Sequence, residues 1–139
     1  MSSAPAYLLD TNILSDLVRN PQGVMAERIT DAGESTVCTS IMVAAEIRYA
    51  AEKSGSISLA DRVDLLLSAI DVLPLKAPAD RRCGQLRHHL TRQGTPIGPN
   101  DLLIAAHALS AELTLVTANV KEFSRVPALA VENWLRHYP

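Results

Sequence analysis

The sequence predicts a three-layer α/β fold, in which a mostly parallel sheet of roughly five strands is covered by helices on both faces. One reason is that short apolar runs alternate with longer stretches of helical periodicity along the chain. This βα alternation implies right-handed crossovers and therefore parallel strands. The other reason is size, because 139 residues that are 47% hydrophobic can bury a core in one domain, which we expect to span residues 1–139.

The individual elements follow from this alternation. Five short, mainly apolar runs have strand character, at residues 7–9, 36–39, 70–73, 113–117 and 130–131. Six stretches between them have helical patterns, at residues 12–19, 24–32, 41–53, 59–68, 80–93 and 101–111. Asn20-Pro21 and the Gly94 to Pro96 segment break the helices that precede them. No repeat, low-complexity tract or linker divides the chain.

Composition restricts the classes of partner. A net charge of -2 argues against a broad basic surface, so contact with nucleic acid would need a local cationic patch. One Trp and one Phe do not indicate a platform for stacking bases. No apolar run approaches the roughly twenty residues that cross a bilayer, and the start from Met1 to Pro5 lacks the pattern of a secretory signal. We therefore expect no membrane contact and a cytoplasmic location.

Three acidic residues stand in apolar segments, unlike the acids of the amphipathic helices: Asp10, Glu46 and Asp101. Helical residues three and four apart share a face, so Glu46 and Asp101 have apolar neighbours on their own faces. Burying an unpaired carboxylate costs several kcal/mol, and few cationic partners are placed to offset three of them. A divalent cation solves this problem, and Mg²⁺ and Mn²⁺ prefer hard oxygen ligands.

Each of these acids also has a structural alternative. Asp10 and Asp101 are placed where a residue could cap a helix or favourably charge its first turn. Glu46 lies mid-helix, and a salt bridge to Arg48 is unfavourable because positions two apart point to different sides.

Polar groups also follow the predicted strands at Asp10 and at Thr117. Ligands of parallel sheets bind beyond the carboxyl ends of the strands, so this edge is the expected ligand site.

Four segments resemble, in order, the motifs of PIN-domain nucleases. They are residues 8–14 (LLDTNIL), 39–49 (TSIMVAAEIRY), 97–106 (IGPNDLLIAA) and 115–123 (LVTANVKEF). Together they look like the VapC-type toxin branch of the family. The resemblance implies that Asp10, Glu46 and Asp101 bind one or two Mg²⁺ or Mn²⁺ ions. It also implies polar support from Thr11, Asn12 and Thr117. Many PIN domains carry a fourth acid in the last motif, where this chain has Asn119, whose amide would bind a second ion less strongly.

The resemblance implies a metal-dependent endoribonuclease that is the toxin of a type II toxin–antitoxin module. It would cleave RNA, with tRNA or another structured RNA as substrate, and inhibit translation until a VapB-like antitoxin binds it. A homodimer and a higher assembly with the antitoxin are also implied. Carboxylate-held metal suits this reaction because it acidifies water and offsets phosphate charge. Glu46 would complete the metal shell or orient the water, and the residues leave both roles open. Arg48, Arg87 and Arg92 are candidate contacts to RNA phosphates.

Other functions fit parts of this pattern. A receiver-type phosphoacceptor module needs an Asp at the end of its third strand, whereas Asp71 begins the third predicted strand. A catalytically idle PIN-fold domain that only binds a partner would not need the three acids together. Nucleotide-binding glycine motifs are missing from the sequence. The histidines, including His107 and His137, lack metal-site spacing and are expected at the surface or in helix packing.

Overall fold

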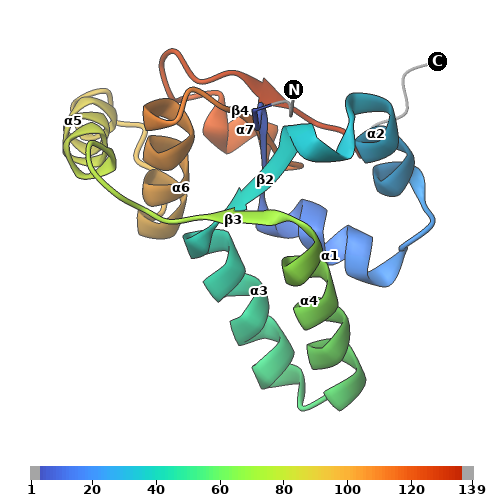
Figure 1. Ribbon diagram of the computed structural model, residues 1–139. Coiled ribbons are helices and arrows are strands. Elements are labelled where there is room, and N and C mark those ends of the chain that lie inside the picture. Colours follow the sequence, from blue (N-terminus) through green and yellow to red (C-terminus); the bar gives the residue numbers. More distant parts are fainter. Residues whose placement is uncertain (1–3, 136–139) are drawn as a thin grey trace.

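The computed structural model describes residues 4–135, in which five parallel strands form one sheet of order β3-β2-β1-β4-β5 (Figure 1). His137 and the first three residues lie outside the described part. In chain order the elements are β1 (Tyr7–Leu9), α1 (Thr11–Arg19), α2 (Val24–Ala32), a 3-10 turn (Glu34–Thr36), β2 (Val37–Ser40), α3 (Ile41–Ser54), α4 (Ile57–Ala69), β3 (Asp71–Leu73), α5 (Ala79–Arg92), α6 (Pro99–Ser110), β4 (Thr114–Val116), α7 (Val120–Phe123) and β5 (Val131–Glu132).

Several helices begin where a side chain satisfies their free N–H groups. Asp10 accepts a hydrogen bond from the first residue of α1, Ser40 caps α3 and Ser56 caps α4. Pro99 opens α6, at a position where the missing N–H costs nothing. Gly55 ends α3 with a φ of 69°, a left-handed conformation that glycine adopts without strain. The sharp turn between α3 and α4 depends on this residue.

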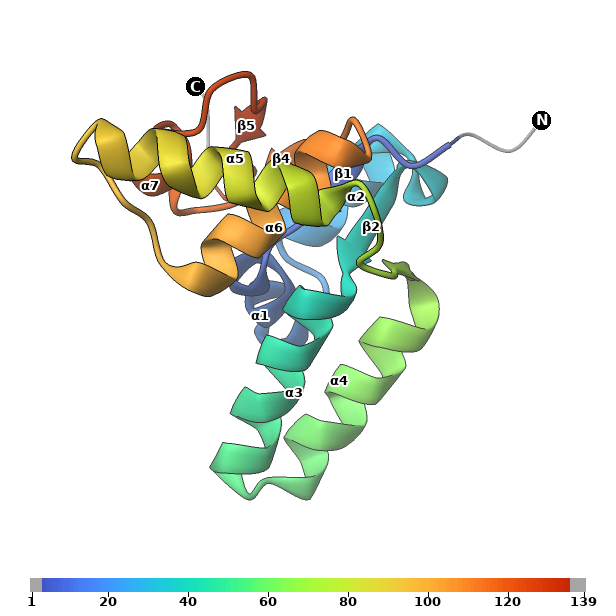
Figure 2. The ribbon, with the colours of Figure 1, turned by 90° about the vertical axis from the view of Figure 1, so that its left-hand side faces the viewer.

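The central strands form the middle layer of the molecule. Their side chains are buried on both faces, as expected for a parallel sheet, and Leu8, Leu9, Cys38, Leu115 and Val116 are fully buried. Helices α5 and α6 lie on one side of the sheet and α1 and α2 on the other (Figure 1). The hairpin of α3 and α4 projects away from the sheet (Figure 2). The predicted three-layer α/β architecture is confirmed.

The predicted element boundaries agree with the structure to within about two residues. The second strand begins one residue later than predicted, because Thr36 ends the 3-10 turn. Helix α7 was not predicted, since four residues are too few to show helical periodicity. No helix in the described range of 4–135 has the length and apolar character needed to span a membrane. Both cysteines are free, with Cys38 buried and Cys83 half-buried.

Candidate active site

Polar side chains meet where the strand order reverses. The sheet extends from β1 toward β2 on one side and β4 on the other, and such a switch point is where ligands bind in parallel sheets. The Asp10 N–H donates to the Val116 carbonyl over 2.9 Å, which ties the ends of β1 and β4 together. Asp10 and Thr117, predicted to lie at this edge, are therefore neighbours.

Asp10 is 4% exposed, and three donors hold its carboxyl group. The Thr11 N–H donates to Oδ1 over 2.8 Å. Thr117 Oγ1 donates to Oδ2 over 2.8 Å, and Asn12 Nδ2 donates to the same oxygen over 3.4 Å. Burial raises the pKa of Asp10, and the negative charge of Glu122 raises it further. The three hydrogen bonds lower this pKa, but they do not cancel the effect of burial. Asp10 thus does serve as a helix cap, and it is also a buried carboxyl group with oxygen lone pairs left over.

Asn12 and Thr117 brace this edge of the sheet. Asn12 accepts a hydrogen bond from the Ala118 N–H over 2.9 Å and donates to Thr117 Oγ1 over 3.3 Å. The Asn119 N–H donates to the same Thr117 oxygen over 3.0 Å. The two contacts of Asn12 join residues that are more than a hundred positions apart, and together the three contacts fix the orientation of Asp10.

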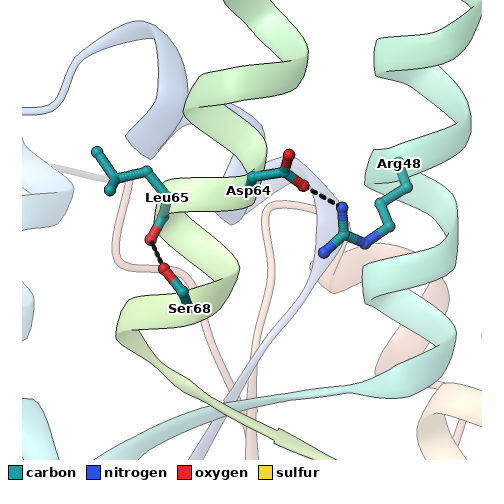
Figure 3. A network of polar contacts seen from close by, with 4 residues as sticks. All are labelled: Arg48, Asp64, Leu65 and Ser68. Carbon is teal, nitrogen blue, oxygen red and sulfur yellow. Dashed lines mark hydrogen bonds and ion pairs between the residues drawn. The ribbon is translucent and has the colours of Figure 1, made fainter.

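Glu46 approaches the same edge from the middle of α3. Thr11 Oγ1 donates to its Oε1 over 3.1 Å, so the residue after Asp10 holds the second acid. Burial raises the pKa of Glu46, and the charge of Asp10 adds to this effect. Arg48 does not pair with Glu46, because its guanidinium group forms an ion pair with Asp64 of α4 (Figure 3). This arrangement agrees with the predicted absence of a Glu46–Arg48 bridge.

Asp101 lies in the first turn of α6, and its carboxyl group shares a hydrogen bond with Glu122. Burial raises the pKa of Asp101 to about 7, with further contributions from this hydrogen bond and from the charges of Glu122, Asp10 and Glu46. All three acids singled out in the sequence therefore lie close enough to influence one another. Asp101 does not cap α6, whose N-cap is Gly98.

Glu122 is a site residue that the sequence reasoning missed. The Gly98 N–H donates to its Oε1 over 3.2 Å, and Asn119 Nδ2 donates to its Oε2. Burial alone would raise the pKa of Glu122, but these hydrogen bonds and the one from Asp101 outweigh it and lower the pKa. In the sequence, Glu122 could have been noticed as an acid three residues after Asn119. The two residues share a face only because α7 is helical.

The other candidate arginines lie on α5. Arg87 lines a groove of about 450 Å³ between α5 and the start of α6, which also includes Thr91 and Pro99. Arg92 is exposed near the end of the same helix. The structure thus places Arg87 beside the helix that carries Asp101, whereas Arg48 is held by Asp64 on the α3–α4 hairpin.

A buried polar pair connects two of the helices that carry the acids. His107 of α6 is 4% exposed, and its Nδ1 lies 2.8 Å from the fully buried Ser40 Oγ, which also accepts the Met42 N–H. Burial lowers the pKa of His107, which favours its neutral form. His107 is therefore a helix-packing residue, as predicted, and it fixes the start of α3 against α6.

The donor set suits a hard divalent cation. Carboxylate oxygens are preferred ligands of Mg²⁺ and Mn²⁺, and the raised pKa values of Asp10, Glu46 and Asp101 show that negative charge is costly here without a cation. Within residues 4–135, no three His, Cys, Asp or Glu side chains form a ready-made metal cage. Mg²⁺ does not require one, because it keeps several waters and binds through one or two carboxylates.

Comparisons with known proteins agree with this geometry. The PIN domain family model matches residues 7–129. The chain is 38% identical to ribonuclease VapC2 of Rickettsia felis over 92% of this chain and 97% of that protein. It is 39% identical to the tRNA(fMet)-specific endonuclease VapC of Shigella flexneri, with the same coverage. It also resembles a chain in the crystal structure of VapBC2 from Rickettsia felis bound to a promoter DNA fragment, with a TM-score of 0.88, 35% identity, and coverage of 93% of this chain and 98% of that one.

These matches confirm the resemblance drawn from the four sequence motifs and exclude the receiver-type alternative. The matched residues 7–129 contain all four acids of the cluster. The chain belongs to the PIN-domain family and, within it, to the VapC ribonucleases.

Proposed function

We propose that this chain is a divalent-metal-dependent endoribonuclease whose reaction takes place at Asp10, Glu46, Asp101 and Glu122. The observation that supports the proposal is the placement of these acids at the switch point of the sheet, where Thr11 contacts both Asp10 and Glu46 and Asp101 contacts Glu122. Such a concentration of acids is unfavourable for folding unless it serves a ligand. A phosphodiester of RNA is the substrate that the family membership supports.

The four acids would have distinct roles. Asp10 and Asp101 would hold the principal Mg²⁺ or Mn²⁺ ion. When bound, that cation would acidify a coordinated water and offset charge on the phosphate. Thr11 fixes Oε1 of Glu46, which leaves Oε2 to complete the metal shell or to orient the water. Glu122 would take the place of the fourth acid, and a second ion would bind through it rather than through Asn119, whose amide donates to Glu122.

The biological role would be that of a toxin controlled by a VapB-like antitoxin. The related chain from Rickettsia felis was solved as part of VapBC2, and a homodimer that assembles further with the antitoxin is the corresponding expectation here. The Shigella flexneri relative is named for cleavage of tRNA(fMet), so tRNA is the first substrate to test. A ribonuclease of this kind would act in the cytoplasm, where its RNA substrate is present, and would inhibit translation.

The test is cleavage of purified tRNA by the wild-type protein and by an Asp10→Ala variant prepared in parallel. We expect the wild type to cleave with Mg²⁺ or Mn²⁺ and to stop when EDTA is added, and we expect the variant to be inactive while folded. Sequencing of RNA ends after controlled expression would then locate the cleavage position. Equal cleavage in EDTA, or equal cleavage by the Asp10→Ala variant, would contradict the proposal.

A further inference from the structure

A pocket of about 350 Å³ opens beside Glu46. Its volume lies within the range of about 300 to 1,000 Å³ typical of ligand sites. Helices α1, α3 and α6 contribute to its wall, which consists of Thr11, Met42, Ala45, Glu46, Tyr49 and Asn100. Because Glu46 and Thr11 belong both to this wall and to the acid cluster, the pocket is continuous with the candidate active site.

Tyr49 is the aromatic residue in the wall of this pocket, and it is 67% exposed. The remaining aromatic side chains within residues 4–135 pack against the core, with Phe123 and Trp134 buried and Tyr7 half-buried. A tyrosine combines a large apolar ring with a polar tip, which makes it suitable for contact with a ligand in water. Leu65 of α4 is exposed to a similar degree, at 72%, but it does not line the pocket.

Tyr49 lies on the same face of α3 as Glu46, one helical turn further along the helix. Residues three apart lie on the same face of a helix, about 4.5 Å from each other along its axis. A strand whose phosphate is held beside Glu46 through a cation would therefore bring an adjacent base within reach of the Tyr49 ring. Single-stranded RNA is commonly recognised by stacking of unpaired bases on aromatic rings and by hydrogen bonds to base edges. Asn100 supplies an amide of the kind needed for such hydrogen bonds.

We propose that Tyr49 forms a stacking subsite for an unpaired base next to the phosphodiester that the chain cleaves. The subsite rests on the proposed ribonuclease function and extends it to the neighbouring nucleotide. The composition, with few aromatic residues, does not indicate such a platform, and the exposure of Tyr49 in a pocket beside Glu46 is visible only in the folded chain. A partner protein could also cover an exposed tyrosine, but the continuity of this wall with the acid cluster through Thr11 and Glu46 favours a nucleotide.

The experiment measures binding of short single-stranded RNAs that carry 2-aminopurine at each position in turn. An Asp10→Asn background prevents cleavage during the measurement. We expect Tyr49→Leu to weaken RNA affinity about 5- to 150-fold, the usual effect of losing one stacking aromatic. It should also abolish the fluorescence quenching of 2-aminopurine at one position. Tyr49→Trp should preserve both, and Leu65→Ala is the matched control that should change neither.

Tyr49 is exposed, so its substitution should leave the unfolding midpoint unchanged. Equal RNA affinity and equal quenching in the Asp10→Asn protein with and without Tyr49→Leu would overturn the subsite. A Tyr49→Leu variant that binds RNA normally but no longer binds the antitoxin would also overturn it and assign the residue to a protein interface. If the wild-type protein neither binds nor cleaves RNA, the proposed function itself fails, which is a separate outcome from the failure of the Tyr49 subsite alone.

Discussion

Asp101 in the first turn of α6 shares a hydrogen bond with Glu122 of α7 through their carboxyl groups. Two adjacent carboxylates repel each other, so one of the pair retains a proton near neutral pH. Burial and this contact raise the pKa of Asp101 to about 7, while Glu122 is held in its charged form by Gly98 and Asn119. A proton on Asp101 would offset the negative charge that a bound divalent cation would otherwise offset.

The contribution of Asp101 to the stability of the metal-free protein should decrease as pH rises from about 4 to about 7. The pKa of Asp101 is about 7 in the folded state against an ordinary value of 3.8. Between these values the folded state binds more protons than the unfolded state, so the free energy of unfolding falls with rising pH. Urea denaturation in EDTA at pH 5 and pH 8 measures this decrease.

The matched variants for this measurement are Asp101→Asn, which should reduce the pH dependence, and Asp61→Asn, an exposed acid of α4 that should not. An Asp101→Asn protein with the wild-type pH dependence would show that Asp101 is not the group responsible.

Glu122→Gln should reduce RNA cleavage by about 10- to 100-fold, the range found when a residue that orients metal ligands is lost. The variant removes a charge beside Asp101, so the pKa of Asp101 should fall toward its ordinary value. Cleavage assays and NMR titration of the Asp101 carboxyl group measure the two effects. Glu112→Gln, in the turn before β4, is the control. Full activity of Glu122→Gln would exclude Glu122 from the site.

Ser40→Ala should destabilise the protein by about 1 to 3 kcal/mol, because it leaves the buried His107 nitrogen without a partner and removes the cap of α3. Cleavage should also decrease through kcat, since α3 carries Glu46. Ser56→Ala removes the exposed cap of α4, at a cost of about 1 kcal/mol, and should leave kcat unchanged. Urea denaturation and steady-state kinetics compare the pair, and equal kcat values in both variants would show that the Ser40–His107 contact does not position Glu46.

Arg87→Ala and Arg48→Ala should have different effects on RNA binding. Arg87 lines the groove beside α6, and loss of one phosphate contact should reduce the salt slope of binding by about 1. Arg48 is engaged by Asp64, so its loss should change the free energy of unfolding by less than about 1 kcal/mol and leave RNA binding unchanged. Binding measured over a range of salt concentrations compares them, and a reduced slope for Arg48→Ala alone would reverse the assignment.

The fold was predictable because its signals are local. Strand β1 agrees with the prediction residue for residue, since an apolar run ends at the capping residue Asp10. Helix α3 agrees because its apolar positions repeat until Gly55. Helix α7 was missed because so short a helix takes its stability from packing, Phe123 being fully buried, rather than from a pattern along the chain.

The candidate site was only partly predictable. Asp10, Glu46 and Asp101 were found because an acid among apolar residues is conspicuous in a sequence. Glu122 was missed because it does not stand in an apolar segment of the sequence. Only the packing of α7 against the start of α6 brings it to Asp101. The pairing of Arg48 with Asp64 was hidden for the same reason, because it depends on how α3 and α4 lie side by side.

Binding of Mn²⁺ to the purified protein, followed by calorimetry, tests the central role of the acid cluster most directly. We predict that the wild type binds at least one Mn²⁺ ion and that Asp10→Asn and Asp101→Asn each weaken this binding at least about tenfold. The exposed-acid control Asp61→Asn should bind as the wild type does. Unchanged Mn²⁺ affinity in both Asp10→Asn and Asp101→Asn would contradict the assignment of these carboxyl groups as a metal site.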